Sequence, residues 1–344
     1  MRKTVHRNRV IVADVRNALA RLPGASVDCV ITSPPYYLLR DYGVPGQIGL
    51  EASVESWVDE LRLAMKGVAR VLKPTGTVWL NLGDSYSRHP GYGAPAKSLL
   101  LGPERLALGL VDDGWTVRNR IAWGKPNPMP SSVRDRLNTT WEFVYLLTRQ
   151  SQYHFDLDAV RVPHRSGHRK SAKAKPVTLL TQGTRPTWAG PLAGSNVGLK
   201  RLKAAGLVGH PLGANPGDVW TIATAGYRGQ HFATFPPALV SRPLLAACPE
   251  RVCRACGQPW QRAHQVHDRQ TQGVLKPTCK CHAGWQPGLV LDPFFGAGTV
   301  GVVAEEHGRD WLGIELNPEF ARMAEERIAA ARKARSEGDA RQAA

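Results

Sequence analysis

The chain has 344 residues, of which 42% are hydrophobic, and this length can bury a full core in one large domain or two moderate ones. The formal net charge of +17 favours a polyanionic partner, since basic side chains gain long-range attraction and release counterions on nucleic acid. No stretch approaches the ~18 consecutive apolar residues of a membrane span, and the N-terminal residues lack the apolar segment of a signal peptide. We therefore expect a cytoplasmic protein that binds nucleic acid; a basic surface kept for solubility is the alternative.

The N-terminal part alternates apolar strands with helical patterns. VIVADVRNALARLPGASVDCVIT predicts a strand, a helix and a second strand that ends at Thr32. From Ser53 to Leu72 apolar residues recur at helical spacing, and Lys73-Pro-Thr-Gly76 then predicts a turn into the strand TVWLNL. Such alternation predicts a mostly parallel, doubly wound α/β sheet.

A rigid, polar loop follows the second strand. In Ser33-Pro34-Pro35-Tyr36 the two prolines restrict the backbone and remove two amide donors, which leaves carbonyl oxygens free to face a ligand. Ser33 Oγ and the Pro34 carbonyl could accept hydrogen bonds from an exocyclic amine while Tyr36 stacks on a flipped base. A simple strand-ending turn is the alternative interpretation.

The middle of the chain changes in composition. Residues 159–217 contain ten Lys or Arg and no Asp or Glu, together with many Gly and Pro. A disordered linker could have this low apolar content, but it has no need for charge of one sign. The pattern favours a DNA-contacting, target-recognition insert.

Five of the six cysteines lie close together after this insert. Two close pairs, CxxC and CxC, are separated by 22 residues, which is typical of a structural zinc site rather than a disulfide framework. The predicted ligands are Cys253, Cys256, Cys279 and Cys281. Cys248 and His282 are the spare candidates, and free thiols are the alternative.

The C-terminal part repeats the strand and helix alternation. The strand LVL leads into the glycine-rich turn DPFFGAG, and a helix begins at Thr299. The next strand ends at Glu315, a further helix begins near Pro318, and residues 333–344 are expected to form a flexible tail.

The glycine-rich turn predicts a cofactor site at the carboxyl edge of the sheet. Gly296 and Gly298 allow the backbone to approach a ligand closely, as in other doubly wound folds that bind nucleotides. We expect Asp292 to face the charged amino acid portion of the ligand and Glu315 to accept hydrogen bonds from ribose hydroxyls. A plain strand-to-helix loop is the alternative.

Together these motifs resemble the amino-methylating DNA methyltransferases. Their catalytic motif, Asp, Asn or Ser followed by Pro-Pro and an aromatic, is matched by Ser33 to Tyr36, and their Phe-x-Gly-x-Gly cofactor motif by Phe294 to Gly298. Because the catalytic motif comes first, the order looks like that of the family's beta group. The resemblance implies a Rossmann-like methyltransferase that uses S-adenosylmethionine on double-stranded DNA.

The resemblance extends over most of the chain. VIVADV, GQIGL, LNLGDSY, KPNPMPSSVRDRLNTTWEFVYLLTRQSQYHFD and DVWTI are similar to family segments, and QHFATFPPALV resembles the element over the methionine part of the cofactor. Asp14 is implied to contact the adenine end. The cofactor-binding residues implied in this way are Asp14, Thr32, Phe235, Pro236, Asp292, Pro293, Phe294, Gly296, Gly298, Thr299, Glu315 and Asn317.

The first catalytic position distinguishes subgroups of this family. Adenine-N6 enzymes usually carry Asp there, whereas Ser33 is similar to the cytosine-N4 enzymes. Cytosine-C5 chemistry is disfavoured because it needs a nucleophilic Cys beside Pro, and Cys29 instead lies inside a strand as an expected core residue. The resemblance thus favours N4-methylation of a flipped cytosine by direct in-line attack, with catalytic residues Ser33, Pro34, Pro35 and Tyr36.

Alternative functions stay open at this point. They are N6-adenine methylation, a catalytically inactive DNA-binding relative, and an RNA or small-molecule methyltransferase. A restriction endonuclease partner is possible within the same system, and the sequence predicts no oligomeric state. The predicted division is a catalytic half (1–158), the basic insert (159–217), a cofactor-covering segment (218–247), a zinc module (248–286), a cofactor-binding half (287–332) and a tail (333–344).

Overall fold

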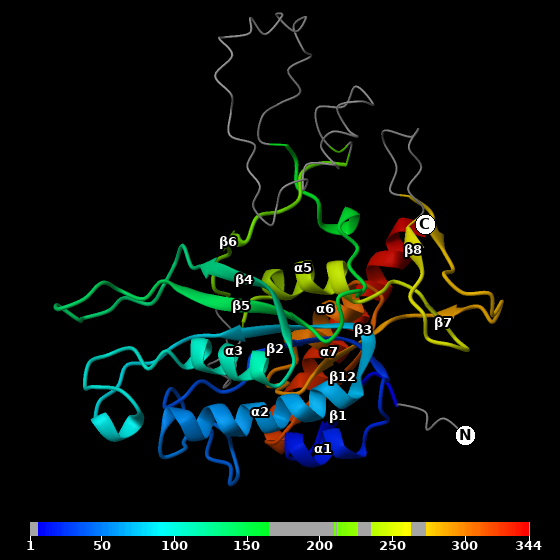
Figure 1. The fold of residues 1–344 in the computed structure, drawn as a ribbon. Coiled ribbons are helices and arrows are strands. Elements are labelled where there is room, and N and C mark those ends of the chain that lie inside the picture. Colours follow the sequence, from blue (N-terminus) through cyan, green and yellow to red (C-terminus); the bar gives the residue numbers. More distant parts are fainter. Residues whose placement is uncertain (1–5, 165–209, 211, 226–234, 263–272, 344) are drawn as a thin grey trace, which may run out of the picture. The chain divides into compact units, whose positions relative to one another are not determined.

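The computed structural model describes residues 6–164, 210, 212–225, 235–262 and 273–343 (Figure 1). These residues belong to two compact units. One comprises residues 1–156, 217–261 and 275–344, and the other residues 157–216 and 262–274. Most of the predicted insert, and residues 226–234 of the cofactor-covering segment, lie outside the described residues. In the second unit a single 3₁₀ turn, η2 (Asp158–Val160), is present among the described residues.

An eight-stranded sheet forms the centre of the first unit, in the order β1-β12-β11-β2-β3-β5-β4-β6. Its pairings are parallel except those that β5 makes with β3 and β4, which confirms the predicted mostly parallel sheet. The strands are β1 (Arg9–Val12), β2 (Val27–Thr32), β3 (Leu72–Leu82), β4 (Thr116–Gly124), β5 (Trp141–Thr148), β6 (Val219–Thr221), β11 (Leu289–Asp292) and β12 (Asp310–Glu315).

Two helical layers cover this sheet (Figure 1). One layer holds α1 (Val15–Arg21), α2 (Val54–Val71) and α3 (Gly102–Asp112), and the other α5 (Pro237–Ala247), α6 (Thr299–Glu306) and α7 (Pro318–Ala343). A 3₁₀ turn, η1 (Pro90–Tyr92), precedes α3. The layers confirm the doubly wound arrangement.

The predicted helix after Ser53 shows how the pattern forms this fold. Ser53 Oγ accepts a hydrogen bond from the backbone N–H of Ser56, which caps the first turn of α2. The apolar face then packs into the core, where Trp57 and Leu61 are almost completely buried. Burial of each such side chain contributes about 1.5–3 kcal/mol. Cys29 is also fully buried, which confirms it as a core residue.

The parallel register brings the functional motifs to one edge. Val12 pairs with Glu315, and Leu291 pairs with Val30. The carboxyl ends of β1, β12, β11 and β2 therefore meet there. Because β5 is antiparallel to β3, its first residues lie at the same edge, and Leu82 at the end of β3 pairs with Phe143.

Two local predictions need correction. The turn expected at Lys73 to Gly76 is part of β3, where the register shifts between the Val27–Leu72 and Cys29–Thr77 pairs, so these residues form an irregularity within the strand. The expected flexible tail from residue 333 continues α7 to Ala343. The alanines and charged residues of this segment are good helix formers, and Arg335 Nη1 donates to the Glu305 carbonyl.

Among the described residues between α5 and β11, the regular structure consists of short strands. These are β7 (Val252–Cys253), β8 (Gln261–Arg262), β9 (Leu275–Lys276) and β10 (Trp285–Gln286). β7 and β10 pair antiparallel, Trp285 with Cys253 and Gln286 with Val252. Within the described part of the chain, no helix combines the length and the apolar character needed to cross a membrane.

Candidate active site

A cavity lies at the carboxyl edge of the sheet. Its empty volume, including the part that is open to solvent, is about 870 Å³. Eight of the twelve predicted cofactor residues line it: Asp14, Phe235, Pro293, Phe294, Gly296, Thr299, Glu315 and Asn317. The segments after β1, β11 and β12 thus converge on one space, as the strand order requires.

Glu315 is prepared to bind hydroxyl donors. Its Oε2 accepts a hydrogen bond from the backbone N–H of Gly296 at 2.7 Å, and its Oε1 accepts one from Asn317 N–H at 2.9 Å. Burial raises the pKa of Glu315, and these amide contacts oppose that shift. Each carboxylate oxygen keeps a further lone pair for the cavity, which suits the predicted contact with ribose hydroxyls.

Asp14 caps α1 beside the same cavity. Its carboxylate accepts hydrogen bonds from the backbone N–H of Arg16 at 2.8 Å and from Arg16 Nε at 3.0 Å. The hydrogen bond from the Arg16 side chain lowers the pKa of Asp14, so the carboxylate is ionised at neutral pH. Arg16 also forms an ion pair with Glu60 of α2, which holds the guanidinium in place.

Four predicted cofactor residues do not line the cavity: Thr32, Pro236, Asp292 and Gly298. Asp292 turns back into the sheet, where only 1% of it is exposed, and accepts hydrogen bonds from Thr32 Oγ1 at 2.7 Å and Phe294 N–H at 3.0 Å. It therefore joins β2 to the glycine-rich turn. A Cβ on Gly298 would lie 2.8 Å from Ala324 Cβ, so this glycine permits packing against α7, and Pro236 is a buried cap of α5.

Sequence reasoning missed part of the cavity wall. The loop before α2 contributes Tyr42, Val44 and Gln47, and α7 contributes Phe320, whose ring meets that of Tyr42 edge to face at 6.3 Å. The GQIGL segment within this loop resembles a family segment, and that resemblance was the only signal that pointed to the loop. No sequence signal pointed to Phe320, because one aromatic residue on a charged helix is not distinctive.

The predicted catalytic loop lies next to the cavity, which Ser33 and Pro35 line. Pro34 and Tyr36 are not in its wall. Ser33 Oγ donates to the Tyr36 hydroxyl at 3.3 Å, and Trp57 Nε1 donates to the Pro35 carbonyl at 2.9 Å. The indole therefore fixes the second proline of the loop from the core side.

A polar network stands behind Tyr36. Its hydroxyl donates to Glu142 Oε2 at 2.7 Å and contacts Asn81 Oδ1 at 3.2 Å. Lys125 Nζ forms an ion pair with Glu142, and Asn81 Nδ2 donates to the same carboxylate at 3.1 Å. Burial, followed by the Glu142 charge, raises the pKa of Tyr36 well above its usual value, so its hydroxyl is protonated.

The residues of this network come from three strands. Asn81 is on β3, Glu142 is the second residue of β5, and Lys125 directly follows β4. None was predicted individually, although Asn81 lies in LNLGDSY, and Lys125 and Glu142 lie in KPNPMPSSVRDRLNTTWEFVYLLTRQSQYHFD, both of which resemble family segments. The sequence signal that could have identified them is the amide of Asn81 and the carboxylate of Glu142 in otherwise apolar strands, since such groups require partners when buried.

The ring of Tyr36 lies against Gly83, where a Cβ would come within 2.7 Å of Tyr36 Cε2. Glycine at this position allows the ring to pack on the end of β3. The aromatic group and its hydroxyl are therefore held from both sides, and the serine that precedes them is positioned by the same contacts.

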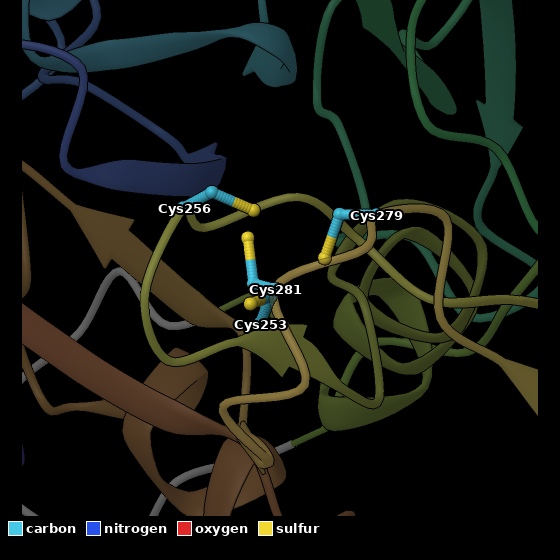
Figure 2. A group of neighbouring side chains, drawn as sticks. All are labelled: Cys253, Cys256, Cys279 and Cys281. Atoms are coloured by element: carbon cyan, nitrogen blue, oxygen red, sulfur yellow. The ribbon is translucent and has the colours of Figure 1, made fainter.

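The four predicted metal ligands also come together. The Sγ atoms of Cys253, Cys256, Cys279 and Cys281 all lie within 4.8 Å of one another and face a common centre (Figure 2). Cys253 is buried and Cys281 is exposed. Cys248 is fully buried at the end of α5, outside this cluster, and neither it nor His282 is part of the group.

Comparison with known proteins identifies the class. Solved structures that resemble the chain include the PvuII DNA methyltransferase, described as cytosine-N4-specific, at 19% identity with a TM-score of 0.55 over 94% of this chain and 90% of that one. A DNA modification methylase from Thermus thermophilus, complexed with S-adenosyl-L-methionine, has 24% identity and a TM-score of 0.52, covering 95% and 96%. At these identities the likeness shows the fold, which is that of Rossmann-like methyltransferases.

Sequence relatives define the family. The Type II methyltransferase M.XycI of Xanthomonas campestris pv. cyanopsidis is 34% identical over 92% of this chain and 85% of its own length, and M.SmaI of Serratia marcescens is 34% identical over 93% and 90%. The family model for N6/N4 DNA methylases matches residues 27–326. The chain belongs to this family of DNA amino-methyltransferases, and the predictions of methyltransferase activity and of S-adenosylmethionine as its cofactor are confirmed.

Proposed function

We propose that this enzyme transfers a methyl group to N4 of cytosine in a specific sequence of duplex DNA. The observation that carries the choice of base is Ser33 at the first position of the catalytic motif, which is similar to the cytosine-N4 group. An exocyclic amine inside a duplex is out of reach, so the target cytosine is flipped toward the catalytic loop.

The cavity is proposed to hold S-adenosylmethionine, which supplies an electrophilic methyl group when bound. The residues present fit this molecule. Glu315 offers carboxylate acceptors for ribose hydroxyls, and Phe235 and Phe294 offer apolar surface. Asp14 is assigned to the adenine end. Asp292 keeps the glycine-rich turn in position rather than meeting the ligand itself.

Ser33 and Pro34 are proposed to activate the amine. Its lone pair is delocalised into the ring, and acceptors that bind its hydrogens favour the pyramidal geometry needed for attack. Because Ser33 Oγ donates its own proton to Tyr36, its lone pairs are left to accept from the amine. The Pro35 carbonyl is occupied by Trp57, so the Pro34 carbonyl is the second acceptor that we assign.

Glu142 is proposed to position Ser33 through the Tyr36 hydroxyl. It accepts from the Tyr36 hydroxyl, which in turn accepts from Ser33, so the carboxylate sets the direction in which the serine proton points. Lys125 balances the charge of Glu142. Much of the rate then comes from holding the amine and the cofactor in line rather than from a covalent intermediate.

Three finer points are part of the same proposal. Residues 159–217 read the target sequence, supported by their ten basic and no acidic residues. The enzyme belongs to the beta group, because its catalytic motif precedes its cofactor motif. It protects DNA against a restriction endonuclease of matching specificity, since the relatives are named Type II methyltransferases.

Mass spectrometry of nucleosides tests the proposed reaction. Plasmid DNA is incubated with purified enzyme and S-adenosylmethionine, and we expect N4-methylcytosine. Ser33→Ala should remove most of the turnover, whereas weakening of one charge-assisted hydrogen bond in Glu142→Gln should lower it by about 10–100-fold. Ser98→Ala, an exposed serine at the surface, is the matched control.

The products separate the alternatives. N6-methyladenine would keep the family and overturn the argument from Ser33. An unmodified plasmid, with cofactor binding intact by calorimetry, would favour an inactive DNA-binding relative.

A further inference from the structure

We propose that Cys253, Cys256, Cys279 and Cys281 bind a single structural Zn²⁺, which holds the segment between α5 and β11 in its fold. Nothing in methyl transfer from S-adenosylmethionine requires this site. Two thiolates on one zinc ion are each about 2.3 Å from the metal, so they lie about 3.8 Å apart in a tetrahedron and never more than about 4.6 Å. The four Sγ atoms all lie within 4.8 Å of one another, so a small inward movement brings them onto one ion.

The chemistry of the donor set selects zinc among metals. Four thiolates without carboxylate or imidazole favour a tetrahedral soft-ligand ion, and both CxxC and CxC turns contribute two ligands each. All four cysteines are free thiols in the structure. A disulfide would need an S–S distance of about 2.05 Å and would use only two of the four positions.

The apolar core formed by the described residues of this segment (249–262 and 273–288) is too small to fold it alone. In its described residues the regular structure consists of two-residue strands, which pair as β7 with β10 and β8 with β9. Packing consists mainly of buried Val252 and of Arg251, whose guanidinium lies 4.4 Å from the Trp285 ring centroid and 5.6 Å from that of Trp260. Segments of about 40 residues generally need a metal or disulfides in addition to their core.

The position of the cluster argues for a structural role. The two ends of the segment meet, because Gly288 N–H donates to the Pro249 carbonyl at 3.1 Å. The turn after Cys256 is attached to the sheet through Lys73, whose Nζ contacts the Gly257 carbonyl at 3.3 Å and Asp28 Oδ1 at 2.6 Å.

Asp28, which pairs with Lys73, also contacts the cofactor-binding half of the chain. Its Oδ2 accepts from the backbone N–H of Leu289, the first residue of β11. Asp28 lies at the beginning of β2 and Leu289 at the beginning of β11, so the cysteine cluster is attached at the amino edge of the sheet. The cofactor cavity is at the carboxyl edge, which places the metal away from the reacting groups.

Metal analysis of the purified full-length chain, prepared without chelators, tests the proposal. We expect one zinc per chain, and one also in the control Cys248→Ala, which removes a cysteine outside the cluster. Cys281→Ser, at the exposed ligand, should release zinc to a competing chelator at least about tenfold more readily, because a neutral hydroxyl replaces a thiolate.

A second measurement does not depend on the variants folding. Cobalt bound by the wild-type chain should give the intense visible absorption of a tetrahedral thiolate complex, and metal removal should open residues 249–262 and 273–288 to proteases. Cofactor binding by calorimetry should survive, which separates this proposal from the proposed function. Zinc near zero, stoichiometric iron, or a mass two hydrogens lower from disulfide formation would each overturn it.

Discussion

Asp292 ends β11 as a buried carboxyl group that accepts hydrogen bonds from Thr32 and Phe294. Burial raises its pKa to about 7, while the hydrogen bonds from Thr32 and Phe294 oppose that shift and the charge of Glu315 adds to it. In the unfolded chain the pKa of an Asp is about 3.9. Between these two values the folded protein keeps a proton that the unfolded chain has lost, so the free energy of unfolding falls as the pH rises through this window.

We expect the wild type to lose about 1–3 kcal/mol of stability between about pH 5 and about pH 8 relative to Asp292→Asn. The amide keeps an oxygen for Thr32 and Phe294 but cannot ionise. Urea unfolding at both pH values measures the difference, and taking the difference between the two proteins cancels the other titrating groups. Parallel pH dependences would show that Asp292 does not ionise in the folded protein.

At the residue scale, the sequence predicted which side chains gather at the cavity better than where each one points. Glu315 and Asp292 both end apolar strands, and this position alone places them at the carboxyl edge. Their orientation depends on neighbouring strands, since Asp292 turns to Thr32 of β2 whereas Glu315 turns to the amides of Gly296 and Asn317. That pairing of strands is not encoded in either local pattern.

At the element scale, α7 supports the cofactor turn. Arg327 Nη1 donates to the Ala297 carbonyl and to Thr299 Oγ1, both at 3.0 Å, and therefore connects the helix to the turn and to the start of α6. The sequence predicted a helix that begins near Pro318. It could not distinguish Arg327 from the other arginines of the same helix, because only the packing of α7 on α6 directs this one inward.

Arg327→Met should weaken S-adenosylmethionine binding by about tenfold, since hydrogen bonds from a charged group contribute about 1.5–3 kcal/mol and part of the effect falls on stability. Methionine retains the apolar stem. Calorimetric titration with the cofactor measures the change. Arg322→Met on the same helix, which removes an exposed pair with Glu326, should bind as the wild type does. Equal losses in both variants would indicate a general effect on α7.

The antiparallel strand β5 explains why the network behind Tyr36 escaped prediction. Alternating strands and helices predict parallel neighbours, and a parallel strand would present its last residues at the active edge. Instead β5 lies between β3 and β4 and presents its first residues, which brings Glu142 next to Asn81 and Lys125. The reversed direction of this one strand thus brings together polar residues whose pairing no local sequence pattern specifies.

At the scale of the whole molecule, the charge of +17 determines how the enzyme meets DNA. Each phosphate neutralised by Lys or Arg releases counterions, so the logarithm of the affinity falls linearly with the logarithm of the salt concentration. For about 6–10 phosphate contacts the affinity should fall by about 10³–10⁵-fold between about 50 and about 200 mM salt. Fluorescence anisotropy with a labelled duplex measures this dependence, and cofactor binding over the same range should change little.

The predicted insert should carry much of this dependence. Replacement of Lys170, Lys173 and Lys175 by Gln should reduce the salt slope by about one for each phosphate that is no longer neutralised, and weaken binding to all duplexes alike. Lys333→Gln, at an exposed lysine of α7, is the control, because it removes the same charge at a single site outside the insert. An unchanged slope in the triple variant would mean that these lysines of the insert do not contact the DNA backbone. The contacts with phosphate would then come from residues outside the insert.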